Sequence, residues 1–322
     1  MQVDFTCIFS FQNGVIVIDA IIMELRHLQA FVKLTQTLNF SAAANELCIT
    51  QSTLSATIKQ LEDDLGVELF SRNSHGVLIT EAGEQLLPFA QEALYQAENC
   101  VSRMYDLSNM KCGRLKIGVT HSFSLMMVEA ILEFNKQYPG IELEIHYKTM
   151  GELLDKLLKH ELDFVLSYKP SVASSLIESH VIFDDKLSFV VSKDNPISSL
   201  ESVTVADIAK YRLALPAKGL QARNLLDEMC KAQGVELKAA MEFDLITPLL
   251  RLVYNSNFAT VLSSASIQSH DYLKAIPIEA EHNLMEGSFH ILKGSYRKKS
   301  AKEFIRILCE TDTVSKLRIN VL

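Results

Sequence analysis

The chain lacks the cysteine spacing of a metal-binding or secreted protein. Its 322 residues contain six cysteines, and no two of them form a Cys-x-x-Cys pair. This scatter argues against a zinc site and against a disulfide framework, and it fits a reducing cytoplasm. The cysteines are Cys7, Cys48, Cys100, Cys112, Cys230 and Cys309.

Long apolar runs and catalytic motifs are also missing. No stretch approaches the roughly 20 apolar residues that a membrane-spanning helix needs. No Ser/His/Asp set, metal cluster or phosphate-binding loop can be assembled from the sequence. We therefore predict a cytoplasmic protein that is not an enzyme, with no catalytic residue, no metal and no cofactor. The length predicts two or three domains, each with its own core.

The first 22 residues do not fit the pattern that follows. They lack the basic region and the cleavage site of a signal peptide. The apolar run from Val15 to Ile22 is short and contains Asp19. We expect Met23 to be the biological start, with residues 1–22 as a mis-assigned leader. The alternative is a short extra strand or an arm.

Residues 41–70 carry the most informative pattern, a helix, a short turn and a second helix. Leu54, Ile58, Leu61 and Leu65 are spaced four, three and four residues apart, which places them on one buried face. A buried stripe behind a compact polar face is what a helix needs to enter the DNA major groove. That polar face consists of Gln51, Ser52, Thr53, Ser55 and Ala56.

The flanking residues complete a winged helix-turn-helix. Apolar positions from Leu25 onward predict a first helix. Ser41 is a plausible N-cap for the second helix and Thr50 for the third, which Gly66 ends. Residues 67–79 predict two short strands around a turn. From periodicity alone, a helical hairpin with no DNA role remains an equal alternative.

This segment is acidic for a DNA-binding domain. The whole chain has a formal charge of −8, and residues 23–90 contain four bases and eight acids, which leaves −4. Basic patches normally supply most of the sequence-independent affinity for DNA. We therefore predict weak binding to non-specific DNA and reliance on more than one DNA-binding unit per complex.

A set of residues at fixed spacing carries a family resemblance: Phe31, Phe40, Ser41, Ala43, Ala44, Leu47, Gln51, Ser52, Ser55, Ile58, Leu61, Glu62, Leu65, Gly66, Leu69, Phe70, Arg72, Gly76, Thr80, Glu81 and Gly83. With these residues, the segment 23–86 resembles the N-terminal domain of the LysR-type transcriptional regulators. The departures are Ala56, where the family usually has a base, and His75, where the wing often has one. The resemblance implies a pseudo-palindromic double-stranded operator, a homodimer or homotetramer, and contact with RNA polymerase at target promoters.

The resemblance also implies which side chains meet the DNA. Bases or phosphates are expected to contact Gln51, Ser52, Thr53 and Ser55. Lys59 is placed against the DNA backbone, and Arg72 or His75 against phosphates beside the wing. Arg72 could instead form a structural salt bridge.

Residues 84–110 predict a long connecting helix. An apolar residue recurs every three or four positions, which is a heptad seam of about two and a half repeats. The resemblance favours an antiparallel dimer of this helix; the alternative is a helix packed on its own domain. Pro88 predicts a start or a kink, and residues 111–113 a hinge. The seam consists of Leu87, Ala90, Leu94, Ala97, Val101 and Met104.

From Arg114 onward, strands alternate with helices. This rhythm predicts an α/β fold with parallel strands, in which the chain leaves one lobe, builds a second and returns. The arrangement is similar to the effector domain of the same regulators and to periplasmic binding proteins. The predicted domains are a leader (1–22), a winged helix-turn-helix (23–82), a linker helix and hinge (83–113), lobe I (114–185 and 275–322) and lobe II (186–274).

Such two-lobed folds bind small ligands in the cleft. The strand at 114–119 points at the start of the helix predicted for 123–137, where free amides and two hydroxyls form an anion site. The resemblance implies an anionic small-molecule effector; helix capping alone and a core role are the alternatives. His121 is expected at the rim. The predicted effector residues are Thr120, Ser122, Phe123, Thr149, Met150, Leu220 and Thr247.

The sequence therefore predicts a LysR-type DNA-binding regulator whose operator binding or DNA bending responds to an effector in the cleft. The alternative within this fold is a thiol redox-responsive regulator that uses Cys230. No second cysteine lies near Cys230 in the sequence, which makes a buried structural thiol the simpler interpretation.

Overall fold

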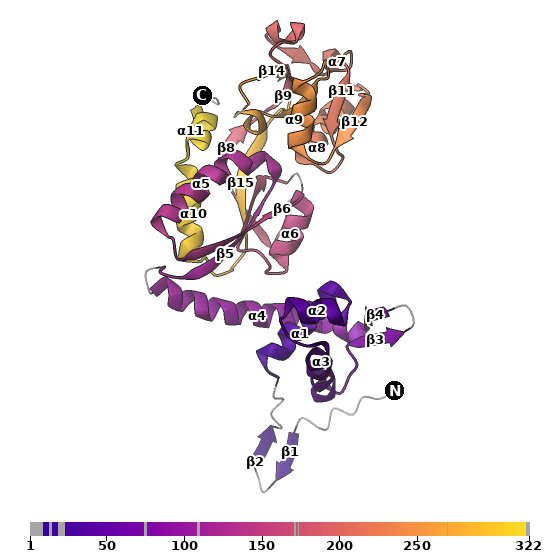
Figure 1. The fold of residues 1–322 in the computed structure, drawn as a ribbon, viewed down its shortest axis with the longest axis vertical. Helices are drawn as coiled ribbons and strands as arrows, with labels where there is room; N and C mark the ends of the chain where they lie inside the picture. Colours follow the sequence, from indigo (N-terminus) through magenta and orange to yellow (C-terminus); the bar gives the residue numbers. More distant parts are fainter. Residues whose placement is uncertain are drawn as a thin grey trace. The chain divides into compact units, whose positions relative to one another are not determined.

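The computed structural model describes residues 9–12, 15–18, 23–73, 76–107, 110–170, 172, 174–268 and 270–319 (Figure 1). The chain divides into two compact units, Met1–Cys100 and Val101–Leu322, and each is described on its own. Within the predicted leader, β1 (Phe9–Gln12) and β2 (Val15–Ile18) pair in antiparallel fashion.

The first unit has a core built from α1 (Leu25–Thr37), α2 (Phe40–Glu46) and α3 (Gln51–Leu65). The predicted stripe on α3 is buried, since Leu54 and Ile58 are 0% exposed. Burying a side chain of this size stabilises a fold by about 1.5–3 kcal/mol. The stripe therefore holds α3 in place and leaves its opposite face in solvent.

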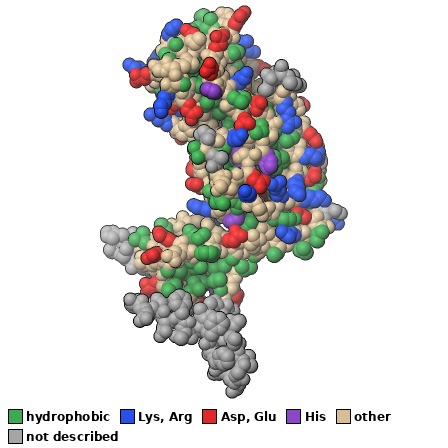
Figure 2. Space-filling model, turned by 180° about the vertical axis from the view of Figure 1, so that it is seen from behind, with side chains coloured by type: hydrophobic (Ala, Val, Ile, Leu, Met, Phe, Trp, Pro, Cys, Tyr) green, Lys and Arg blue, Asp and Glu red, His purple; other side chains and the backbone are tan. Residues whose placement is uncertain are grey.

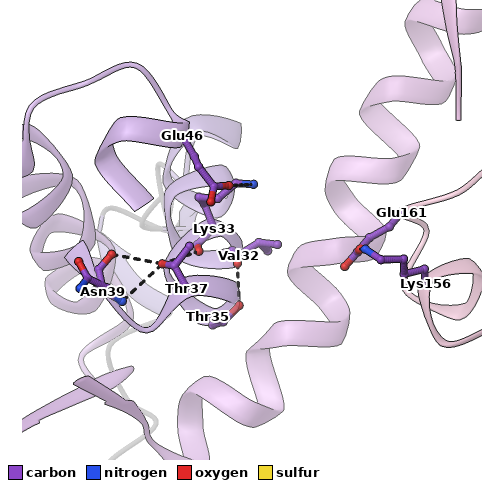
Figure 3. Close-up of polar contacts among 8 residues, drawn as sticks. All are labelled: Val32, Lys33, Thr35, Thr37, Asn39, Glu46, Lys156 and Glu161. Carbon is purple, nitrogen blue, oxygen red and sulfur yellow. Dashed lines mark hydrogen bonds and ion pairs between the residues drawn. The ribbon is translucent and has the colours of Figure 1, made fainter. Parts of the chain in front are cut away.

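The sequence predicts the N-cap of α3 correctly but not the N-cap of α2. Thr50 caps α3, because its Oγ1 accepts a hydrogen bond from Thr53 N at 3.1 Å. The prediction that Ser41 caps α2 is wrong: Asn39 is the N-cap, and its Oδ1 accepts from Ala42 N at 3.0 Å. Thr37 Oγ1 lies 3.2 Å from Asn39 O and helps to hold this turn (Figure 3).

The wing consists of β3 (Phe70–Asn73) and β4 (Gly76–Ile79), paired in antiparallel fashion. The Glu62 carboxylate fixes its entry, because Oε1 accepts hydrogen bonds from Leu69 N at 2.8 Å and Phe70 N at 3.1 Å. One acid of this acidic segment thus has a structural role.

The connecting helix is α4 (Glu81–Leu107), which belongs to both units. It begins seven residues before Pro88, which lies inside the helix, so the predicted start at Pro88 is not observed. Ala90 is 1% exposed within the core of the first unit, and Leu87 and Leu94 pack against that core. Val101 and Met104 are 50% and 60% exposed. The predicted seam thus has a packed first half and an open end.

Lobe I of the second unit is a five-stranded sheet in the order β6-β5-β7-β15-β8. The strands β5, β6 and β7 run parallel, whereas β15 is antiparallel to both of its neighbours. Their bounds are β5 (Gly113–Val119), β6 (Ile141–Tyr147), β7 (Phe164–Tyr168), β8 (Ile177–Asp185) and β15 (Met285–Leu292).

Helices cover both faces of this sheet. Phe164 on β7 faces α5 and α10, where Phe134 and Phe304 pack with ring centroids 5.2 Å apart. Val165 points the other way, into a separate cluster with α6, as the alternation of a strand requires. Lys156 Nζ pairs with Glu161 Oε2 at 2.5 Å after α6 (Figure 3). The helices are α5 (Ser124–Gln137), α6 (Met150–Leu158), α10 (Lys299–Cys309) and α11 (Asp312–Ile319).

Lobe II combines the sheet β10-β14-β9-β13 with the parallel pair β11-β12. Ile276 on β14 lies opposite Phe189 on β9, so residues 273–279 belong to lobe II. The lobe boundary predicted at Ala275 therefore moves to the loop after Glu279. The strands are β9 (Leu187–Ser192), β10 (Val203–Thr204), β11 (Leu213–Pro216), β12 (Ala239–Phe243), β13 (Thr260–Ser263) and β14 (Leu273–Glu279).

Helices α7 (Val205–Ile208), α8 (Gln221–Gln233) and α9 (Ile246–Tyr254) complete lobe II. The α/β class predicted for the second unit is confirmed. Among the helices in the described part of the chain, none has the length and apolar character to cross a membrane.

Candidate DNA-binding helix and ligand cleft

The start of α3 presents a polar face to solvent. Gln51, Ser52 and Thr53 are exposed. Thr50 Oγ1 lies 2.9 Å from Ser52 Oγ and 2.8 Å from Thr53 Oγ1, and Ser41 Oγ donates to Gln51 Oε1 at 3.0 Å. These bonds link the hydroxyls and the amide at the start of α3. Ser55 is partly buried and lies one turn further along.

Few cations of the first unit are available for phosphates. Lys33 Nζ pairs with Glu46 Oε2 at 2.8 Å, and Arg26 Nε with Glu24 Oε2 at 2.9 Å. Exposed Lys59 on α3 has no ion-pair partner among the described side chains. The side chains of Arg72 and His75, both predicted to contact DNA, lie outside the described part.

The cleft between the lobes contains an unsatisfied hydroxyl. Thr120 follows β5 and is 8% exposed, and its Oγ1 has no hydrogen-bond partner although it is buried. Thr120 is the N-cap of the short helix η2 (His121–Phe123), but its side chain makes no cap bond. Capping therefore does not account for this side chain. A buried hydroxyl without a partner costs about 1–3 kcal/mol.

The structure brings five of the seven predicted effector residues to one cleft. Its lobe I wall also includes His121 and Lys148, and its lobe II wall the loop before α8. The enclosed volume is about 30 Å³, which is room for about one water. The residues that line it are Thr120, His121, Ser122, Lys148, Thr149, Met150, Pro216, Gly219, Leu220, Gln221, Ala222, Ile246 and Leu262.

Two predicted effector residues lie elsewhere. Phe123 is 0% exposed and packs in lobe I, with its ring 5.1 Å from that of Tyr168. Thr247 is exposed, and its neighbour Ile246 lines the cleft instead. The amide of Phe123 is not free either, because it donates to Thr120 O at 3.0 Å.

Gln221 joins the two lobes. Its Nε2 donates to Tyr168 O at 2.6 Å, and its Oε1 accepts from Tyr168 N at 3.3 Å. These bonds connect the start of α8 in lobe II to the end of β7 in lobe I. They bridge the two lobes beside the cleft. Neither Gln221 nor Lys148 has a sequence signal that would have marked it.

Thr149 lines the cleft but is committed to its helix. Its Oγ1 donates to Glu152 Oε2 at 2.7 Å, and its amide donates to the same oxygen at 3.0 Å. This capping box starts α6. Thr120 is therefore the better placed of the two threonines to bind a ligand.

A buried pair supports the crossing between the lobes. Tyr168 OH donates to Asp185 Oδ2 at 2.6 Å, and Ala265 N donates to the same oxygen at 3.0 Å. Burial raises the pKa of the Asp185 carboxyl and that of the Tyr168 phenol. These groups connect the lobe I sheet to Ala265 in lobe II.

The described thiols do not form a redox pair. Cys48, Cys100 and Cys112 are exposed, whereas Cys230 and Cys309 are buried or partly buried, and all of them are free. Burial raises the pKa of the Cys230 and Cys309 thiols, which disfavours the reactive thiolate. No group of three or more His, Cys, Asp or Glu within the described ranges could hold a metal ion.

A polar helix on a helix-turn-helix unit, joined to a two-lobed ligand domain, defines a ligand-responsive DNA-binding regulator. Residues 25–84 match the model for the bacterial regulatory helix-turn-helix protein of the lysR family, and residues 108–312 match that for the LysR substrate binding domain. The chain belongs to the LysR family of transcriptional regulators.

The curated proteins that this chain resembles include two HTH-type transcriptional regulators. The chain is 26% identical over 296 residues to the HTH-type transcriptional regulator CzcR of Bacillus subtilis (strain 168), covering 91% of this chain and 99% of CzcR. It is 32% identical over 190 residues to the uncharacterized regulator YnfL of Escherichia coli (strain K12), covering 58% and 64%.

Solved structures of similar fold include two regulators. A full-length OxyR variant from Pseudomonas aeruginosa has a TM-score of 0.68 and 22% identity, covering 92% of this chain and 96% of that one. Full-length CbnR, solved in complex with its target DNA, has a TM-score of 0.61 and 20% identity, covering 89% and 99%. These likenesses confirm the fold.

Proposed function

We propose that a small anion is the effector of this LysR-type regulator and that it binds in the cleft at Thr120. The observation that carries this proposal is the buried Thr120 hydroxyl without a partner. Exposed Lys148 and partly buried His121 stand at the same cleft and supply positive charge or hydrogen-bond donors. An oxyanion or a short carboxylate would accept from all three groups.

Binding would act on the closure of the lobes. The part of the cleft at Thr120 has space for about one water, so a larger anion bound there must part the walls on either side of Gln221. An anion that binds the open form better than the closed form shifts the population toward the open form. Gln221 would thus act as a latch that competes with the effector.

The DNA contacts of the proposal lie on α3 and the wing. Gln51, Ser52, Thr53 and Ser55 would contact bases or phosphates, and Lys59, Arg72 or His75 would contact phosphates. With so few cations, one unit would bind weakly, and a homodimer or dimer of dimers on a pseudo-palindromic operator would supply the affinity.

The remaining parts of the proposal concern assembly and context. We assign dimerisation to the seam of α4, in particular to exposed Val101 and Met104. The protein would act in the cytoplasm, contact RNA polymerase at its promoters and catalyse no reaction. We also propose the domain limits given above, with the boundary between the lobes placed after Glu279.

The test uses two matched threonine variants. Thr260 is a second buried threonine with an unpaired Oγ1, but it does not line the cleft. Calorimetric titration of the full chain with sulfate, acetate and succinate should show binding of at least one anion. Thr120→Val should weaken it about tenfold, as expected for a lost hydrogen bond to a charged ligand. Thr260→Val should leave it unchanged.

Two results would count against the proposal. Equal affinities of wild type and Thr120→Val would place the anion elsewhere. If none of the three anions binds, the effector is not a small anion of this kind. Thermal unfolding of each variant checks that the fold is intact.

A further inference from the structure

Lobe I contains a second cavity, remote from the cleft, at the start of α10. Its volume is about 270 Å³, close to the lower end of ligand pockets. The floor is apolar and consists of Phe289, Ile291, Ala301 and Ile305. No residue of this cavity lines the cleft at Thr120.

Three basic residues line the cavity, and two of them form ion pairs with acids of lobe I. Lys298 is neutralised by Asp163, whose Oδ1 lies 2.8 Å from Lys298 Nζ. Arg297 pairs with Glu178 at 2.5 Å. Lys302 lines the cavity, is exposed, and has no ion-pair partner among the described side chains. Figure 2 shows Lys and Arg side chains gathered on this part of lobe I.

An apolar floor beneath a single unpaired ammonium group selects a particular ligand chemistry. A monoanion with an apolar body would bury its hydrocarbon on the floor and place its charge at Lys302. A doubly charged or sugar-like ligand would leave polar groups unpaired on the floor, which costs free energy. The volume suits one ring or a short acyl chain.

The cavity also touches the end of α4. Tyr296, which lines the cavity, donates its hydroxyl hydrogen to Asp106 Oδ2 at 2.6 Å. Lys299 N donates to the same oxygen at 2.9 Å, and the Arg103 guanidinium lies over the Tyr296 ring at 4.5 Å. The last turn of α4 is thus clamped to a wall of the cavity.

We propose that this cavity binds a small amphiphilic monoanion and couples it to α4 through Tyr296. A ligand on the floor would contact the Tyr296 ring and restrain the clamp on Asp106. Because α4 continues into the DNA-binding unit, the site would add a second input to the regulator. The inference does not depend on the anion proposed for the cleft.

Binding is tested with phenylacetate, hexanoate and the neutral isostere phenylacetamide, titrated calorimetrically into the full chain. Lys302→Gln should weaken phenylacetate and hexanoate at least fivefold and leave phenylacetamide unchanged. Lys299→Gln is the matched control, since it removes an exposed neighbouring charge that does not line the cavity. Ala301→Leu fills the floor and should weaken all three ligands, while Thr120→Val should affect none.

Equal affinities of Lys302→Gln and Lys299→Gln would overturn the site, as would binding of neither carboxylate. The coupling is tested by hydrogen exchange of residues 101–107. Phenylacetate should slow their exchange in wild type, and Tyr296→Phe should bind phenylacetate with no such slowing. Binding without any change in exchange in wild type would overturn the coupling.

Discussion

The DNA-binding unit and the start of α10 in lobe I each leave one lysine without an ion-pair partner among the described residues, but the two lysines have different surroundings. In the first unit, Lys33 and Arg26 pair with nearby acids at the surface, and Lys59 alone remains on α3. At the start of α10, Lys298 and Arg297 are paired with acids. Lys302 lines the apolar cavity and has no ion-pair partner among the described residues.

The difference separates two kinds of recognition. A helix with one available cation reads DNA through hydrogen bonds and gains affinity by acting in multiples. A cation over a cavity selects one charged ligand. We therefore expect the first unit to bind DNA weakly, so that ligands of the second unit can adjust its affinity for DNA. The following predictions test this difference between the two units.

The largest effect is expected from Leu54→Ala in the core of the first unit. Leu54 is 0% exposed, and removing such a side chain costs about 2–5 kcal/mol. DNA binding should be lost, while anion affinity at the cleft should be retained in calorimetry. A parallel loss of anion affinity would show that the two units do not behave separately.

Acid should weaken lobe I through His290, which lies between Ser167 and Ser179. Burial lowers the pKa of this imidazole to about 4, whereas in the unfolded chain it is about 6.5. The unfolded state therefore binds the proton first, and about 3 kcal/mol of stability should be lost as the pH falls from 6.5 to 4. Thermal unfolding across this range measures the loss, and His290→Asn should flatten it. An equally steep profile for His290→Asn would contradict this assignment.

The corrected helix cap gives a smaller effect in the first unit. Asn39→Ala should cost about 1 kcal/mol, because it removes the acceptor for the Ala42 amide. Ser41→Ala should cost much less, since Ser41 is exposed and lies inside α2. Denaturant unfolding of the two variants compares them, and the reverse order would show that the cap is misassigned.

The smallest effect concerns phosphate contacts. Lys59→Gln should lower the slope of log K against log salt by about one for each protein unit bound. Lys33→Gln is the control, because Lys33 is already paired with Glu46. Titration of an operator duplex selected from a random library by the wild type, at several salt concentrations, gives both slopes. Equal slopes for Lys59→Gln and wild type would remove Lys59 from the interface.

The sequence predicts the individual helices and strands better than it predicts which of them pack or pair together. The stripe on α3, the Thr50 cap and the alternation in lobe I are local patterns, and the structure contains them. The cap at Asn39 was missed because Thr37 and the preceding turn decide where α2 begins. The assignment of β14 to lobe II depends on its pairing with β9, which is distant in the sequence.

The residues of the cleft show the same limit of prediction from the sequence. Thr120 and Ser122 are predicted from the sequence, because the strand before them points at the start of a helix. Gln221 and Lys148 reach the cleft only through the packing of the two lobes, and no local pattern marks them. The sequence also assigned Ala90 to a dimer seam, although the first unit buries this residue in its own core.

The most direct test is the affinity for the selected operator duplex with and without the anion that binds best at the cleft. We expect a change of about 5- to 150-fold in wild type, the usual range of coupling between two sites. Thr120→Val should show no change at the same anion concentration, and Thr260→Val should behave like wild type. An operator affinity that is identical with and without bound anion in wild type would contradict the account.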